Sequence, residues 1–276
     1  MDNSEASARA ILGQYLELAA AEMAGEIQAI VLIGSLATGS YIAGPGDIDQ
    51  VTILRDSAPA EAAGGVHCLI DEVMRRCDHA VHMADMIYRR SDFDRPWPQS
   101  WDLDPATRHM VTIPEELLRM HDHGQVVFGR LDIVDLPCPS REEMTAYRQR
   151  WRQWNAQWEA ANSGLNAGLN LLNRPRIPLR ISVQCTLSNA MDHYYFATGK
   201  TCFSKHQIGA RLRQEVPGYL FADQVELATK VRMGGFIASA EEEAALSEGC
   251  KKMLQWMREH AVAAVPADGL ADNQDA

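Results

Sequence analysis

Apolar residues recur at helical spacing at the start of the chain and then give way to a short β-branched run. In residues 4–23 the apolar positions are three to four apart, which predicts a helix that buries one face. These positions are Ala8, Ile11, Leu12, Tyr15 and Leu16. Ser4 precedes them and suits the N-cap position. Residues 29–33 form an uninterrupted apolar run of strand length, which is typical of a buried strand.

Turn residues then separate two more strand-length segments and a second helical pattern. A loop rich in glycine and proline leads into residues 47–54, which suit a second strand. Residues 60–77 have helical spacing, and residues 80–88 suit a third strand. The order helix, strand, strand, helix, strand predicts a small α/β (α+β) domain with a mixed sheet.

The character of the chain changes near Pro137. Pro137 and Pro139 cannot both lie inside a helix, and Ser140 with Glu143 has the form of a capping box that opens one. The sequence beyond is rich in helix-forming residues, interrupted mainly by proline and glycine pairs. We therefore predict three parts, namely an α/β domain at 1–136, an all-α helical bundle at 137–265 and a flexible tail at 266–276.

Composition and charge exclude several classes of protein. The chain is 46% hydrophobic, and no apolar run approaches the roughly 18 residues that a membrane span needs. A net charge of −11 argues against a nucleic-acid partner, because such proteins present a basic face to phosphates. The six cysteines lack metal-ligand spacing, and no basic segment precedes an apolar one at the N-terminus. We therefore expect a cytoplasmic protein with reduced thiols.

The first candidate for chemistry is a glycine–serine pair followed by two aspartates. Gly34 lets the backbone approach a ligand closely, and Ser35 with the amides after it can donate to phosphate oxygens. Asp47 and Asp49 project from the same side of the second strand, because alternate residues of a strand share a face. Two adjacent carboxylates repel each other, and Mg²⁺, which prefers hard oxygen ligands, is the natural cation to neutralise them.

Asp85 adds a third carboxylate within the apolar third strand. If that strand lies beside Asp47 and Asp49, Asp85 is either a third metal ligand or a base for an attacking hydroxyl. A purely structural explanation is that the first two aspartates end a loop and that Asp85 faces water at an edge. We favour the catalytic interpretation, because the glycine–serine pair, the two aspartates and a third acidic strand occur together.

At these residues the chain resembles the nucleotidyltransferase superfamily of DNA polymerase β type. The signature of that superfamily is Gly-Ser, Asp-x-Asp and a third carboxylate on a neighbouring strand. The resemblance implies that Gly34 and Ser35 hold a nucleoside triphosphate and that Asp47, Asp49 and Asp85 form the Mg²⁺ site. The implied reaction moves a nucleoside monophosphate, here AMP from ATP, to an acceptor hydroxyl, and pyrophosphate leaves.

A looser resemblance, to the bacterial aminoglycoside adenylyltransferases of the streptomycin and spectinomycin class, extends further along the chain. It is carried by residues 113–118, 121–124 and 187–200. Those enzymes join such a domain to a helical bundle and bind the drug between the two. His193 and Lys205 stand where the resemblance implies a Trp and an Asp that contact the drug, and a lysine there disfavours streptomycin itself.

The triphosphate also calls for a basic side chain from the helical half of the chain. The candidates are Lys200, Lys205, Lys230 and Arg232, of which we single out Lys205 and Lys230. Gln50 is a further departure, because the family usually has an apolar residue there.

Two aromatic or polar clusters have a structural as well as a functional explanation. Trp151, Trp154 and Trp158 share one helix face, which could stack a ring but is more typical of packing. We interpret His121-Asp122-His123 as a solvated loop, because consecutive residues rarely converge on one metal ion.

Two classes of function remain open. The first is an enzyme that adenylylates a small hydroxylated molecule, with an aminoglycoside-like acceptor as our first choice; the net charge is still −8 without the three aspartates of the tail and would attract a polycation. The alternative is a nucleotidyltransferase of a toxin–antitoxin or regulatory system that modifies a protein, or a nucleotide-binding regulator. The intact acidic trio favours an enzyme. No sequence feature indicates the oligomeric state.

Overall fold

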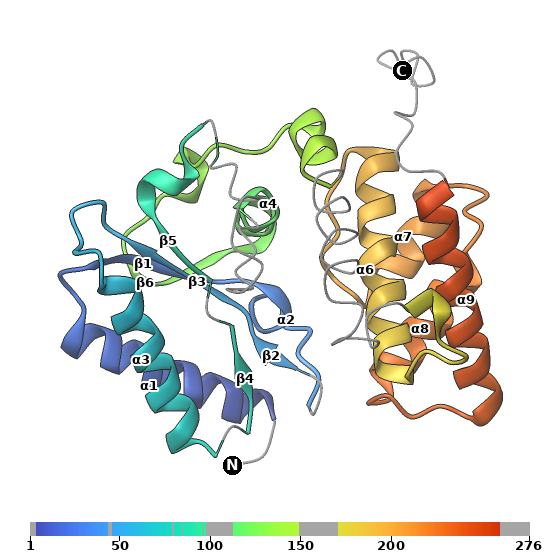
Figure 1. Cartoon of the computed structure of the whole chain (residues 1–276), viewed down its shortest axis with the longest axis horizontal. Coiled ribbons are helices and arrows are strands. Elements are labelled where there is room, and N and C mark those ends of the chain that lie inside the picture. The colour runs from blue at the N-terminus through green and yellow to red at the C-terminus, as the bar shows by residue number, and fades with distance from the viewer. Residues whose placement is uncertain are drawn as a thin grey trace. The chain divides into compact units, whose positions relative to one another are not determined.

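A computed structural model shows two compact units within the chain (Figure 1). It describes residues 4–43, 46–78, 80–84, 86–95, 97, 113–148 and 171–259. The first unit comprises Met1–Ser140 together with Thr201–His206, and the second comprises Arg141–Lys200 and Gln207–Ala276. The short segment Thr201–His206, which the sequence analysis assigned to the helical bundle, thus belongs to the first unit. In the described part of the chain, no helix is both long and apolar enough to cross a membrane.

A mixed four-stranded sheet forms the centre of the first unit. The strands of this unit are β1 (Ile27–Leu32), β2 (Asp47–Ile48), β3 (Gln50–Leu54), β4 (His82–Met83), β5 (Met86–Arg89) and β6 (Gln125–Gly129). The sheet order is β5-β3-β1-β6, with β1 antiparallel to both neighbours and β5 parallel to β3. A second, short ladder joins β2 to β4 in parallel. The mixed sheet confirms the predicted fold class.

Helices cover both faces of this sheet, which explains why the first strand is apolar and buried at each position from Ala29 to Leu32. Ile30 and Leu32 of β1 pack in one core with α1 (Glu5–Glu22) and α3 (Ala62–Arg76). Val31, between them, packs in a second core with α4 (Ile113–His123). Because successive side chains of a strand point to opposite faces, a strand buried on both sides favours apolar residues at consecutive positions.

Several local predictions can be compared with these elements. Ser4 is the N-cap of α1, as predicted, and its hydroxyl accepts a hydrogen bond from the Ser7 N–H at 3.2 Å. The predicted strand 47–54 is two strands that are interrupted at Asp49. The predicted strand 80–88 is likewise two short strands, β4 and β5. Strand β6 and helix α4 were not predicted as elements; β6 pairs with β1 alone at the sheet edge and is largely exposed, so its burial pattern is weak.

Helices make up the described part of the second unit. They are residues 141–148, the 3-10 helix η4 (Leu171–Asn173), α6 (Leu179–Thr198), α7 (Ile208–Glu215), α8 (Ala222–Met233) and α9 (Ala240–Glu259). Helix α6 contacts α7, α8 and α9 and so forms the centre of the unit. Gly199, with φ of +72°, ends α6 in the left-handed conformation that glycine adopts without steric cost. Trp151, Trp154 and Trp158 lie outside the described residues, so the interpretation of that stripe stays a prediction.

Candidate active site

The glycine–serine pair lies at the turn after the central strand. Gly34 opens the short helix α2 (Gly34–Ala37) and has φ of +71°, in the left-handed region. A Cβ atom at this position would lie 2.1 Å from Oδ2 of Asp49, far inside the contact distance of two atoms. Only glycine therefore allows the turn to pack directly against the Asp49 carboxyl group.

The two aspartates share one side of the chain at the junction of β2 and β3. Ile48 and Gln50 are fully buried, whereas Asp47 and Asp49 between and beside them are half-buried, as the alternation predicted. Burial raises the pKa of the Asp49 carboxyl, and the charge of Asp47 raises it further. The two carboxyl groups thus repel each other in a partly desolvated place, which is the condition that favours binding of a cation.

Three basic side chains act on Asp49 in the opposite direction. Arg119, Lys205 and His123 each lower its pKa, although burial and Asp47 prevail. Arg119 and His123 are on α4, and Lys205 is on the segment Thr201–His206. The site therefore combines an acidic pair with basic side chains, among them the cations Arg119 and Lys205, from two parts of the chain that are distant in sequence.

The segment Thr201–His206 is held against α4 by an aromatic side chain. The Phe203 ring centroid is 5.7 Å from Cζ of Arg119 and 5.6 Å from the centroid of the His123 ring. A guanidinium over an aromatic face gains electrostatic as well as dispersion energy. These contacts place the segment that carries Lys205 beside the end of α4.

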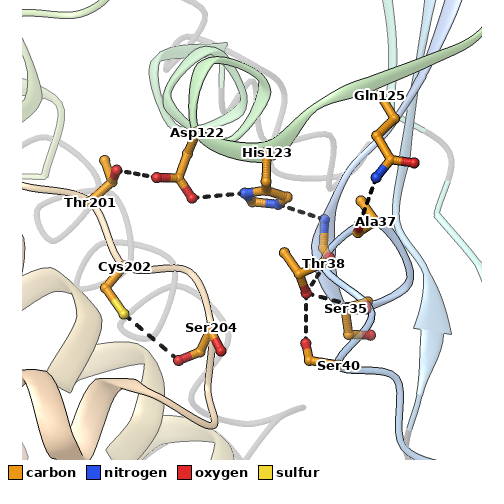
Figure 2. Close-up of polar contacts among 11 residues, drawn as sticks. Ser35, Ala37, Thr38, Ser40, Asp122, His123, Gln125, Thr201, Cys202 and Ser204 are labelled. Atoms are coloured by element: carbon orange, nitrogen blue, oxygen red, sulfur yellow. Dashed lines mark hydrogen bonds and ion pairs between the residues drawn. The ribbon is translucent and has the colours of Figure 1, made fainter.

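Hydrogen bonds from three other elements hold the α2 turn, and Figure 2 shows those from His123 and Gln125. The Gly34 N–H donates to Nε2 of His123 at 2.9 Å, and Nε2 of Gln125 donates to the Ala37 carbonyl at 2.7 Å. From α1, Arg9 donates to the Leu36 carbonyl at 3.2 Å. The turn is thereby fixed to α4, β6 and α1, so its position does not depend on its own four residues alone.

The donors and acceptors at this turn suit a magnesium-bound triphosphate. Within the described residues, Oγ of Ser35 is buried and has no hydrogen-bond partner, so its hydroxyl remains available to a ligand oxygen. Asp47 and Asp49 supply the hard carboxylate oxygens that Mg²⁺ prefers. No group of three or more metal-binding side chains occurs among the described residues, and Asp85 is not one of these.

Of the site residues predicted from the sequence, the first unit contains Gly34, Ser35, Asp47, Asp49 and Lys205. Lys230 lies in the second unit, where its Nζ is 2.6 Å from Oε1 of Glu242. Asp85 lies outside the described residues, but the strands on either side of it in the sequence, β4 and β5, pair with β2 and β3 respectively. The roles of Asp85 and Lys230 stay predictions.

The sequence analysis misjudged the run His121-Asp122-His123, which is the last turn of α4 and no solvated loop. The His123 side chain is only 9% exposed, and the His121 ring lies 3.1 Å from the Leu136 carbonyl oxygen. One signal in the sequence could have indicated a helix face here. Asp122 and His123 follow Arg119 by three and four residues, and Gly124 comes directly after them.

His193 also has a defined structural place. Its ring centroid is 4.7 Å from that of Tyr219 and 5.4 Å from that of Trp256, all within the second unit. Burial lowers the pKa of His193, so the ring is predominantly neutral at pH 7. It packs as an aromatic side chain among others.

One solved structure has the same arrangement of elements over nearly its whole length. A crystal structure of spectinomycin adenyltransferase AAD(9) from Enterococcus faecialis, with ATP and spectinomycin, matches 90% of this chain and 99% of its own, with a TM-score of 0.55 and 12% sequence identity. The chain thus shares the fold of that adenyltransferase. No family model matches the chain, and no curated protein matches it. The structural likeness agrees with the resemblance that the Gly-Ser and Asp-x-Asp motifs carry.

Proposed function

We propose that this protein is a Mg²⁺-dependent nucleotidyltransferase that moves AMP from ATP to a hydroxyl group of a small molecule. The observation that carries the proposal is the packing of the Gly34 turn directly on Asp49, whose pKa is raised by burial and by Asp47. Such an arrangement places the backbone of a turn and the unpartnered Ser35 hydroxyl next to an acidic pair that favours a cation. The fold likeness to an adenyltransferase solved with ATP supports ATP as the donor.

In this proposal each residue of the turn has its own task. The Gly34 N–H already donates to His123, so Gly34 serves by its small size and brings the backbone against Asp49. The Ser35 hydroxyl, buried without a partner in the described structure, donates to a phosphate oxygen. Lys205, whose charge acts on Asp49, offsets the negative charge of the triphosphate; Lys230 is a weaker candidate because it already pairs with Glu242.

The proposed step is an in-line displacement at the α-phosphorus. The acceptor oxygen forms a bond to that phosphorus, the bond between it and the bridging oxygen breaks, and pyrophosphate leaves with the electron pair. Asp47 and Asp49 would hold Mg²⁺, which when bound neutralises charge on the attacking and leaving oxygens. The proton of the acceptor hydroxyl goes to a carboxylate, for which Asp85 is our candidate if it is not itself a metal ligand.

We propose an aminoglycoside-like acceptor as the first choice. The net charge of −11 favours the approach of a polycation, and the fold neighbour was solved with spectinomycin, a small hydroxylated ligand. Streptomycin remains the disfavoured member of the class, because Lys205 stands where the resemblance implies a carboxylate. A cytoplasmic location and a role in antibiotic resistance belong to the same proposal.

The decisive experiment follows the label from α-³²P-ATP. The purified protein is incubated with labelled ATP and Mg²⁺, with either a panel of aminoglycosides that includes spectinomycin and streptomycin or a cell lysate. We expect label on a small molecule, dependent on Mg²⁺ and absent with the Asp49→Asn variant. Label on a protein, with none on any aminoglycoside, would favour the toxin–antitoxin or regulatory alternative. If no label is transferred in either arm, the protein is not the proposed enzyme.

A further inference from the structure

A continuous series of hydrogen bonds connects the segment Thr201–His206 to the Gly34 turn through the end of α4 (Figure 2). The Thr201 hydroxyl donates to Oδ1 of Asp122. The other carboxylate oxygen of Asp122 is 3.0 Å from Nδ1 of His123. Nε2 of His123 is 2.9 Å from the Gly34 nitrogen. All four residues belong to the first unit.

The direction of every proton in this series is fixed by the chemistry of the groups. A backbone N–H can only donate, so Nε2 of His123 accepts from Gly34 and carries no proton. In a neutral imidazole the proton is then on Nδ1, which donates to the Asp122 carboxylate. The carboxylate accepts from Thr201 as well, and its charge strengthens both hydrogen bonds.

This arrangement resembles the way a carboxylate orients a functional histidine, except that the histidine here holds backbone. His123 is nearly buried, and its ring also packs against Phe203 from the same segment as Thr201. The segment therefore contacts α4 through a hydrogen bond at Thr201 and a ring contact at Phe203, two residues before Lys205. A shift of this segment would therefore move the His123 ring and, through its hydrogen bond, the Gly34 backbone.

We propose that His123 is a positioning residue for the triphosphate site, held in its tautomer by Asp122 and Thr201. It fixes the Gly34–Ser35 turn relative to the segment that carries Lys205, so that the Ser35 hydroxyl and the Lys205 ammonium meet the same triphosphate. The proposal rests on the proposed function, because it assigns these two groups to a nucleotide. It adds three residues, Asp122, His123 and Thr201, that the signature motifs do not contain.

The first test is spectroscopic and needs no turnover. In ¹⁵N-glycine-labelled protein, the Gly34 amide proton, which donates to an imidazole nitrogen, is expected well downfield. His123→Phe keeps a ring against Phe203 but removes the acceptor, so the Gly34 signal should move upfield. His123→Gln keeps an acceptor at a similar reach and should restore most of the downfield shift. An unchanged signal in His123→Phe would overturn the proposal.

The second test separates positioning from simple loss of stability. For His123→Phe we expect KM for MgATP to rise at least about tenfold, the equivalent of one lost hydrogen bond, with a smaller change in kcat. His123→Gln should recover most of the wild-type KM. Thr201→Val, which removes only the hydroxyl, should raise KM in the same direction. Thr145→Val, whose hydroxyl donates to the Arg141 carbonyl in the second unit, is the matched control and should leave KM unchanged.

Combining the variants shows whether the residues act as one series. If Thr201 acts through Asp122 and His123, the double variant His123→Phe with Thr201→Val should be no worse than His123→Phe alone. If the double variant instead multiplies the two single rises in KM, the residues do not act as one series. A wild-type KM in His123→Phe would also contradict the proposal, as would a His123→Gln variant with a KM as high as that of His123→Phe.

Binding of the α,β-methylene analogue of ATP, with Mg²⁺, distinguishes this proposal from the proposed function. Wild-type protein that fails to bind the analogue would overturn both. If the wild type binds and the His123→Phe variant binds equally well, only the positioning role fails. Thermal unfolding of each variant, measured in parallel, confirms that binding is compared between folded proteins.

Discussion

At the scale of single residues, Asp49 shows how a proposed metal ligand can destabilise the protein that carries it. Its pKa is raised, so the folded state resists ionisation of this carboxyl more than the unfolded chain does. Above the ordinary pKa of an aspartate the charge therefore costs stability. We expect Asp49→Asn to abolish AMP transfer and yet to raise the Tm of the Mg²⁺-free protein by a few degrees at pH 7.

The raised pKa of Asp49 also predicts how the gain in Tm of Asp49→Asn depends on pH. Below the ordinary aspartate pKa, Asp49 is protonated in both the folded and the unfolded state, so wild type and Asp49→Asn should have the same Tm. As pH rises, the Tm of the variant should exceed that of wild type by a growing amount. Binding of Mg²⁺ to the wild type should reduce this difference. Asp56 is the control of opposite sign, because a hydrogen bond from Ser91 lowers its pKa and Asp56→Asn removes no repulsion. A lower Tm for Asp49→Asn than for wild type would contradict this account.

Gly34 is expected to be irreplaceable for a reason that Gly218, another left-handed glycine, lacks. Gly34→Ala meets both the cost of the left-handed backbone, about 1–2 kcal/mol, and the Asp49 carboxyl group in its path. Gly218, with φ of +78°, has open space where a Cβ would lie. Gly218→Ala should therefore lose stability alone, whereas Gly34→Ala should lose stability and transfer activity, as denaturant unfolding and the labelled assay can measure.

At the scale of elements, a buried polar chain ties α1 to β3 and to the segment before β5. Burial raises the pKa of Tyr15 to about 12, so its hydroxyl stays protonated and donates to Oγ1 of Thr52 at 2.7 Å. Thr52 donates in turn to Gln50 at 2.8 Å, and the Gln50 amide donates to the Ala84 carbonyl at 2.9 Å. Gln50, which stands where the family that the sequence resembles usually has an apolar residue, is thus one member of a fully hydrogen-bonded network.

The position of Thr52 in that chain predicts an asymmetry between two conservative variants. Tyr15→Phe removes the first donor and should cost about 1 kcal/mol of unfolding free energy. Thr52→Val removes the hydrogen-bond partner of both the Tyr15 hydroxyl and the Gln50 amide oxygen and should cost about 2–5 kcal/mol. Equal costs, measured by urea unfolding, would mean that the hydroxyl groups do not act in series.

Elements with a regular spacing of apolar residues or a local capping signal could be predicted from the sequence. Elements that depend on tertiary contacts could not. The N-cap at Ser4 and the apolar run of β1 are local signals. The break of the second strand at Asp49 is different, because it arises where Gly34 packs on that residue. Strand β6 has little burial of its own and exists through its pairing with β1.

The candidate site likewise contains residues that the sequence predicts and residues that only the fold brings in. Gly34, Ser35, Asp47 and Asp49 are close in sequence and form a recognisable motif. The effect of Lys205 and Arg119 on Asp49 depends on how distant segments pack, which no local pattern records. His123 was misjudged because its partner, the Gly34 N–H, lies 89 positions away in the chain.

At the scale of the whole molecule, the net charge of −11 predicts a dependence on salt. Long-range attraction speeds the encounter of oppositely charged partners and is screened as ionic strength rises. With ATP saturating, kcat/KM for a polycationic acceptor should fall several-fold between about 0.01 and about 0.3 M KCl, whereas kcat/KM for an uncharged hydroxylated acceptor should hardly change. A salt effect of equal size for both acceptors would point to an effect on the enzyme itself.

The first unit is synthesised in two steps, because its two stretches, Met1–Ser140 and Thr201–His206, are separated in the sequence. The sixty residues Arg141–Lys200 belong to the second unit and leave the ribosome between Ser140 and Thr201. At about 5–20 residues per second, the N-terminal stretch waits on the order of 3–12 s for Thr201–His206. During that interval the nascent chain has its acidic pair but neither Phe203 nor Lys205. A chain that terminates before Thr201 would thus lack part of the proposed nucleotide site, so we expect such a product to be inert in AMP transfer.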